Sequence, residues 1–256
     1  MKWRTVKAGL LTFLLASAAG SQGSYDPRVG DKPDAEFQMA RVIYPTNARA
    51  GSHGTIQPMW AVDYPLAEAH FLTALARYTR IDVAKDSRHL DLNDDRLFQY
   101  PFLFLQQPGY WYPGEHEVAR LREYLLRGGF LFLDDFHGGD WGAFEDAITR
   151  VLPEYRIEDI PKDDAIMQIF FVIDQRTQVP GDRHLRRGFN GEVVVNMPPP
   201  AWRGIYDDHH RLMVIANYNQ DTGDAWEHAD DPEYPLPMTA FAYQMGTNYI
   251  LYALTH

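Results

Sequence analysis

Two short apolar runs, Phe102–Leu105 and Phe130–Leu133, constrain the fold of this chain more than any other feature. Both read Phe-Leu-Phe-Leu. Four residues are too few for a helix, and neither run alternates with polar residues as a half-exposed strand does. Uninterrupted runs of this length are typical of strands that are buried on both faces of a parallel sheet. The sequence therefore predicts an α/β fold.

The segment between the two runs has the pattern of a crossover helix. Glu115–Arg127 carries apolar residues at helical spacing, and Gly128-Gly129 follows it as a stop signal. Acidic residues at the start and Arg127 at the end suit the helix dipole. A βαβ unit of this kind is almost always right-handed, and both of its strands end at the same edge of the sheet.

Further elements are expected on both sides of this unit. Strands or extended segments are expected at Phe37–Tyr44, Ile81–Val83, Tyr155–Ile160, Ile166–Ile173 and Leu212–Ala216. Helices are expected near Pro65–Tyr78, Gly142–Leu152 and Met238–Leu254. Arg88–Arg96 is expected to be a polar connection or a helical turn, and Arg176–Pro200 mostly loop. This order predicts one domain over residues 37–256, built as a three-layer, flavodoxin-like, mostly parallel sheet.

The first 36 residues are expected to lie outside that domain. Lys2, Arg4 and Lys7 precede the apolar stretch Ala8–Ala16, and small residues follow at Ala16-Ser17-Ala18. This pattern predicts a signal peptide over residues 1–18, and its apolar part is too short to span a bilayer. Residues 19–36 read as a flexible leader. We expect an exported protein, periplasmic or extracellular, without a membrane span once the signal peptide is removed; an uncleaved anchor is the alternative.

The charge and the missing cysteines restrict the possible partners and chemistry. The 256 residues carry a formal net charge of −11, and loss of three basic and no acidic residues in positions 1–18 would make it −14. Such a surface disfavours nucleic acid and anionic lipid. The chain has no cysteine, which excludes disulfides, thiolate ligands and a cysteine nucleophile. No motif for a cofactor or a metal is present, so none is assigned.

Polar residues follow both apolar runs, at the edge where ligands of open α/β sheets bind. The candidate catalytic residues are Asp134, Asp135 and His137, and the candidate ligand-binding residues beside them are Gln106, Gln107, Asp140 and Trp141. Successive strand side chains point to opposite faces, so one aspartate is expected to face the crevice and the other to bind a backbone amide or cap a helix. The alternative role for Asp140 is to cap the following helix.

A second polar cluster follows the expected strand Leu212–Ala216. Asn217–Glu227 contains Asn217, Asn219, Asp221, Asp224, Trp226 and Glu227. A long polar segment with a tryptophan suits a flap over the crevice, and a tight structural loop is the alternative. Candidate ligand-binding residues here are Asn217, Asn219, Asp224, Trp226 and Glu227. Asp63, just before Pro65, is either a further one or a helix cap.

Four segments together resemble an uncharacterised bacterial family, domain of unknown function 4159. They are Ala40-Arg41-Val42-Ile43-Tyr44, Asp63-Tyr64-Pro65, Gly128–Asp135 and Asn217–Glu227, and the resemblance spans residues 37–255. It implies a class I glutamine-amidotransferase-like fold with a distant similarity to trehalose-utilisation proteins. Two features depart from these relatives. Amidotransferases carry a cysteine where this chain has Asp134-Asp135, and Asp164-Ala165 stands where family members often have a His-Pro pair.

Three functions follow as hypotheses. The first is an exported domain without the cysteine nucleophile that binds a small polar ligand, possibly carbohydrate-like, or a protein partner at the sheet edge. The second is a hydrolase of carbohydrate-like substrates that uses Asp134 or Asp135, possibly with a metal. The third is a non-catalytic interaction domain of a cell-envelope complex.

Overall fold

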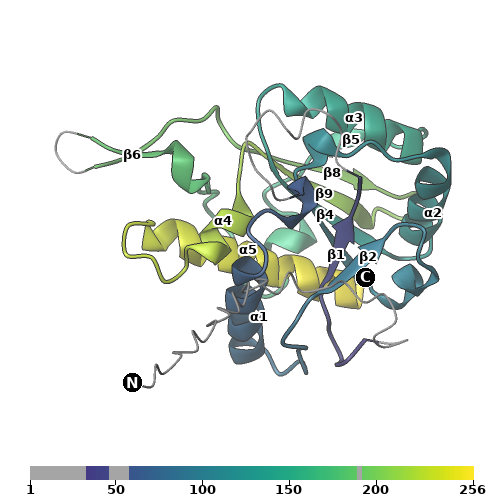
Figure 1. Cartoon of the computed structure of the whole chain (residues 1–256), viewed down its shortest axis with the longest axis horizontal. Coiled ribbons are helices and arrows are strands. Elements are labelled where there is room, and N and C mark those ends of the chain that lie inside the picture. The colour runs from purple at the N-terminus through teal and green to yellow at the C-terminus, as the bar shows by residue number, and fades with distance from the viewer. Residues whose placement is uncertain (1–32, 46–57, 189–191) are drawn as a thin grey trace, which may run out of the picture.

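The computed structural model describes residues 33–45, 58–188 and 192–256. At its centre lies a seven-stranded sheet, shown in Figure 1, in the order β2-β1-β3-β4-β9-β8-β5. In chain order these strands are β1 Ala40–Ile43, β2 Arg88–Asp91, β3 Phe102–Gln106, β4 Phe130–Phe136, β5 Ile157–Asp159, β8 Ala201–Tyr206 and β9 Leu212–Tyr218. The five strands from β2 to β9 in sheet order are mutually parallel, and β8 runs antiparallel to both of its neighbours. The expected mostly parallel α/β sheet is therefore confirmed.

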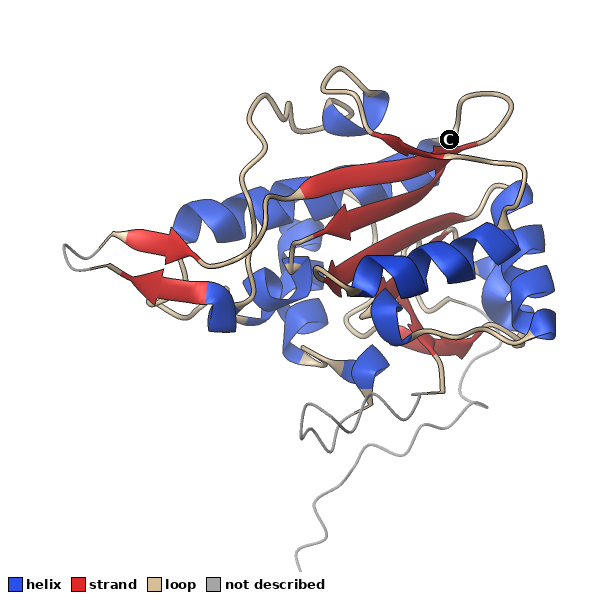
Figure 2. Ribbon diagram, turned by 90° about the horizontal axis from the view of Figure 1, so that it is seen from above, coloured by secondary structure: helices blue, strands red, loops and turns tan. Residues whose placement is uncertain are grey.

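Helices cover both faces of this sheet. The first face carries α1 Leu66–Tyr78, α4 Thr222–Glu227 and α5 Leu236–Thr255; the second carries α2 Glu115–Leu126 and α3 Asp140–Val151. The remaining described elements are 3-10 turns at Met59–Ala61, Asp95–Gln99, Pro108–Tyr110, Ala165–Met167 and Asp182–His184 and a hairpin of β6 Leu185–Arg187 and β7 Val193–Val195. Figure 2 shows this hairpin projecting from the body of the molecule. None of the described helices is both long enough and apolar enough to cross a membrane.

The two Phe-Leu-Phe-Leu runs form the middle of the sheet in register. Phe102 pairs with Phe130 and Phe104 with Phe132 on adjacent parallel strands. The phenylalanines pack into the hydrophobic cluster under α1, α4 and α5, whereas the leucines between them pack into the cluster under α2 and α3. The alternation of strand side chains thus fills both cores from the same eight residues.

Two expected strands are wrong. In Ile81–Val83, only Val83 makes an isolated bridge, to Phe37, and the edge strand is instead Arg88–Asp91, which was expected to be a connection. An edge strand has one neighbour and needs few apolar residues, so its sequence resembles a connection; only Leu90 of this strand is fully buried.

Ile166–Ile173 is not a strand either. A 3-10 turn over Ala165–Met167 begins it, and the side chain of Asn248 on α5 takes over part of its backbone hydrogen bonding. The Asn248 amide donates to the carbonyls of Ile166 and Phe171 at 3.0 and 2.8 Å and accepts the N–H of Phe171 at 2.9 Å. The backbone groups of Ile166 and Phe171 are thereby paired without a neighbouring strand.

Residues 217–227 do not form the expected flap. Asn217 and Tyr218 extend β9, and Thr222–Glu227 is the helix α4, whose residues pack against α1 and α5. The side chain of Asp221 accepts the N–H of Asp224 at 2.9 Å and so caps this helix. The predicted signal peptide, residues 1–18, and most of the predicted leader, residues 19–36, lie outside the described residues.

Candidate functional site

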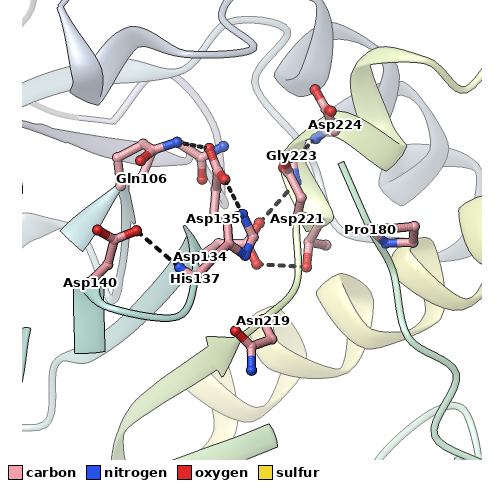
Figure 3. A network of polar contacts seen from close by, with 12 residues as sticks. Gln106, Asp134, Asp135, His137, Asp140, Pro180, Asn219, Asp221, Gly223 and Asp224 are labelled. Carbon is pink, nitrogen blue, oxygen red and sulfur yellow. Dashed lines mark hydrogen bonds and ion pairs between the residues drawn. The ribbon is translucent and has the colours of Figure 1, made fainter. Parts of the chain in front are cut away.

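The two aspartates near the end of β4 have different surroundings. Asp134 is fully buried, and its carboxylate accepts the N–H of Gly223 at 2.9 Å and the hydroxyl of Thr222 at 2.8 Å. Burial raises its pKa to about 7 against the opposing effect of these hydrogen bonds. Asp135 lies within an irregularity of the β4–β9 pairing, between Leu133 and Phe136, and lines a cavity. Figure 3 shows it beside Asp134 and His137. Asp134 therefore holds α4 in place, while Asp135 is available to a ligand.

The cavity has a volume of about 540 Å³ and lies at the carboxyl edge of the sheet. β9 runs parallel to β4, so its polar continuation reaches the same edge as the ends of β3 and β4. Seven acidic residues and three histidines line the cavity, and Arg183 is its one lysine or arginine among the described residues. The acidic residues are Asp63, Asp135, Asp140, Asp182, Asp221, Asp224 and Glu227, and the histidines are His137, His184 and His228.

The carboxyl groups of this cavity are crowded. Burial, and then the charges of Asp224 and Asp135, raise the pKa of Asp63 well above its usual value. Burial, with Asp135 and Asp224, does the same to the pKa of Asp221. The pKa of Asp224 rises to about 6, chiefly through burial. Repulsion between these carboxyl groups favours a neutral or positively charged ligand over an anionic one.

Asp135 and His137 form a hydrogen-bonded pair at the cavity wall. The Nε2 of His137 lies 2.9 Å from one carboxylate oxygen of Asp135, and the side chain of Gln107 donates to the other. Burial lowers the pKa of His137, but the hydrogen bond and charge of Asp135 outweigh it, and the net pKa is raised. The ring of His184 lies beside that of His137, with centroids 5.3 Å apart. The pair has the residue types and contact of a general acid–base couple.

Strained backbone concentrates around the cavity. Asp63, Gln107 and Asp135 have φ angles of 65°, 54° and 55° and all three line it. Non-glycine residues in this left-handed region are uncommon, and they gather at functional sites.

A buried arginine positions Asp63. The guanidinium of Arg41 on β1 donates to the carbonyls of Trp60 and Val62 at 2.8 and 3.0 Å and pairs with Glu68 of α1. Gln106 then donates to the Asp63 carboxylate. The segment before α1 is thereby fixed against the end of β3.

Three groups of side chains in the described residues could hold a metal ion. They are Asp135–His137–Asp221, Asp182–Asp224–His228 and Asp63–Asp224–Glu227. In each group the potential ligand atoms lie within 4.8 Å of one another. The two groups that contain a histidine mix carboxylate and imidazole donors, which suits Mn²⁺ and Zn²⁺.

Residues 38–254 match the family described as "Domain of unknown function (DUF4159)". The chain belongs to this family. No curated protein matches the chain. The match takes in β1 to β9 and nearly all of α5, so the cavity lies entirely within the DUF4159 region.

In this DUF4159 domain, the fold brings seven of the sequence-predicted site residues to the cavity wall. They are Asp63, Gln107, Asp135, His137, Asp140, Asp224 and Glu227. Asp140 has a second role, because its carboxylate accepts the N–H of His137 at 3.1 Å and braces the turn before α3.

Two further predicted site residues lie beneath the side chains that line the cavity. Asp134 and Gln106 are both fully buried, and each binds a polar group of the site from underneath. They hold α4 and Asp63 in position and do not reach the cavity.

Trp226 is in the wrong place for its expected role. It is fully buried, and its ring stacks on Phe71 of α1 with centroids 4.1 Å apart. α4 is amphipathic, with Asp224 and Glu227 toward the cavity and Trp226 toward the core. The tryptophan therefore anchors the helix and is not a lid over a ligand.

Three further predicted ligand-binding residues hold neighbouring segments together: Asn217, Asn219 and Trp141. Asn217 donates to the Thr222 hydroxyl and accepts from Tyr249, and Asn219 accepts the N–H of Gly138 and donates to the carbonyl of Pro199. Trp141 stacks on Phe136 with Arg203 over its ring. These side chains make hydrogen bonds or ring contacts with neighbouring segments and do not line the cavity.

Several residues of the wall were not predicted. Asp182, Arg183 and His184 come from a segment that reads as loop, and no local pattern directs it toward the sheet edge. Asp221 and His228 flank α4, and the spacing Asp221-x-x-Asp224 is a helix-start pattern that could have located this helix.

Proposed function

We propose that this domain binds a small polar ligand, neutral or cationic, in the acidic cavity at the carboxyl edge of its sheet. The observation that carries the proposal is the cavity of about 540 Å³ with seven acidic residues in its wall. Its size is within the range of small-molecule sites, and Tyr64 and Tyr110 add aromatic surface. Carboxylates beside aromatic rings suit polyhydroxylated or amino-bearing compounds, so carbohydrate-like ligands remain the leading class.

A hydrolase is the second candidate. The Asp135–His137 contact at 2.9 Å supports it, because the pair faces the cavity and combines a carboxylate with an imidazole. Asp135 would act as the general base toward a water molecule, oriented by Gln107 and His137. A purely structural interaction domain is less well supported, since it would not need an open, charged cavity.

The relationship to class I glutamine amidotransferases is part of the proposal. The βαβ order and the left-handed backbone of Asp135 near the end of β4 support it. The absence of cysteine from the chain argues against glutaminase chemistry at that turn. Export, through a signal peptide over residues 1–18, also belongs to the proposal and is supported by the sequence pattern alone.

A ligand screen tests the binding function. The purified domain is titrated calorimetrically with neutral disaccharides, amino sugars and polyamines, and with uronic acids and sugar phosphates as anionic counterparts. Neutral or cationic compounds should bind, and anionic ones should not. Asp135→Asn should weaken binding at least tenfold, whereas Asp208→Asn, at an exposed aspartate in the turn before β9, should not change it. Preference for the anionic compounds would refute the proposal.

A further inference from the structure

We propose that Asp135, His137 and Asp221 bind one divalent metal ion of the Mn²⁺ or Zn²⁺ class in the wall of the cavity. The inference rests on the proposed function and deepens it, because such an ion would coordinate the oxygen atoms of a polar ligand. Three protein donors leave coordination positions open toward the cavity, as in metal sites that act on ligands.

The three side chains converge from two elements that the sheet brings together. Asp135 lies near the end of β4, His137 follows that strand, and Asp221 precedes α4. Their potential ligand atoms lie within 4.8 Å of one another. Asp135 and Asp221 are only 3% and 6% exposed. Two shielded carboxylates and an imidazole form a mixed oxygen and nitrogen donor set.

One buried polar atom of this group, on His137, has no hydrogen-bond partner in the described residues. Asp221 accepts the N–H of Asp224 through Oδ1, but its Oδ2 receives no hydrogen bond from the described residues. The Nδ1 of His137 is buried and also lacks a partner there. Buried polar atoms are nearly always paired, and an ion beside the uncommitted carboxylate oxygen of Asp221 would give the imidazole nitrogen of His137 its partner.

Neighbouring groups would support such an ion. Gln107 donates to Asp135 and orients its carboxylate, and a carboxylate oxygen has a second lone pair for a metal. No lysine or arginine other than Arg183, which is exposed, lines this cavity in the described part of the chain. A cation would relieve the repulsion between Asp135 and Asp221.

Gly181 leaves the space in which Asp221 lies. A Cβ at this position would come within 2.8 Å of Asp221 Oδ2, 3.1 Å of Asp224 Oδ2 and 3.3 Å of His184 Nδ1, so Asp221 is the closest of the three. The backbone of Gly181, at φ −60° and ψ 151°, is open to any residue, so the close approach and not the conformation requires glycine. Gly181→Ala should therefore push Asp221 away from the ion without unfolding the chain.

The other two groups are weaker candidates. Asp182 is exposed, and Asp224 Oδ2 already accepts the N–H of Asp182 at 2.7 Å. Asp63 is engaged by Gln106. The group around His137 is the best shielded of the three.

Titration with the metal alone tests the site. Full-length protein, stripped with a chelator, is titrated calorimetrically with ZnCl₂ and MnCl₂. One ion per chain should bind, and His137→Gln, Asp221→Asn and Gly181→Ala should each weaken binding at least tenfold. His209→Gln, the same change at an exposed histidine before β9, should leave it unaltered. Circular dichroism and thermal unfolding verify that every variant is folded.

Two outcomes would overturn the proposed metal site. One is that no metal binds at millimolar concentration. The other is that metal binding is lost in His228→Gln but not in His137→Gln, which would place the ion on the group Asp182–Asp224–His228. The ligand screen separates this inference from the proposed function. A compound that binds equally with and without chelator would refute the metal site and leave ligand binding intact. Metal binding that depends on His137 and Asp221, with no compound bound, would support the site and refute the ligand proposal.

Discussion

The carboxylate of Asp134 accepts the backbone N–H of Gly223 at 2.9 Å, which ties the end of β4 to the first turn of α4. A fully buried side chain thus joins two segments that are 89 residues apart in sequence. Asp221 and Asp224 keep their places in the cavity wall because α4 is held by this contact.

Asp134→Ala should destabilise the domain by about 2–4 kcal/mol, because Gly223 N–H and the Thr222 hydroxyl lose a buried acceptor. Asp134→Asn should cost only about 1 kcal/mol, since its amide oxygen still accepts from Gly223. Urea unfolding measures both, with exposed Asp208→Ala as the control. Equal losses of unfolding free energy in Asp134→Ala and Asp134→Asn would show that the hydrogen bond to Gly223 does not account for the destabilisation.

Asp221→Asn should stabilise the metal-free protein at pH 7.5 by about 1–2 kcal/mol, because it removes one buried carboxylate whose pKa is raised. Asparagine can still cap α4 through its side-chain oxygen. Asp221→Ala loses that cap as well, at a cost of about 1 kcal/mol relative to asparagine. Thermal unfolding in the presence of chelator separates the two variants, and a less stable Asp221→Asn would contradict the repulsion argument.

Trp226→Ala should cost about 3–5 kcal/mol, because it leaves a large cavity between α4, α1 and the sheet. Trp226→Phe should recover part of the loss, since a smaller ring can still stack on Phe71. Denaturant unfolding gives the free energies. A Trp226→Ala protein of wild-type stability that only bound ligand less well would restore the flap interpretation.

His89 should make the domain less stable in acid. Burial first, and then the charges of Arg41 and Arg88, lower its folded-state pKa to about 4. Its ring packs against Trp60 and Tyr64.

Between pH 6.5 and pH 4 the unfolded chain binds a proton at His89 and the folded chain does not, so this contribution is present above 6.5 and lost as the pH falls. Between pH 7 and pH 4.5, the free energy of unfolding of the wild type should fall by about 1–2 kcal/mol more than that of His89→Gln. This value allows for the partial exposure of the ring to solvent. Urea unfolding at both pH values measures the difference. An unchanged difference would show that His89 does not titrate in this way.

The sequence alone determined the centre of this fold. Phe102–Leu105 and Phe130–Leu133 could be assigned to buried parallel strands because apolar runs of four residues between turn signals are too short to form helices of their own. Once those strands were placed, the edge that carries Gln107, Asp135 and His137 followed from the direction of a βαβ crossover.

Only the tertiary structure decided what the polar segments do. Asn217–Glu227 is polar enough to read as a loop, yet α4 is stable because Trp226 is buried and Asp134 accepts its amide. Asp182 and His184 reach the cavity through a connection that carries no local signal. Local patterns report which side chains avoid water, whereas the meeting of Asp135 with Asp221 depends on contacts between segments more than eighty residues apart.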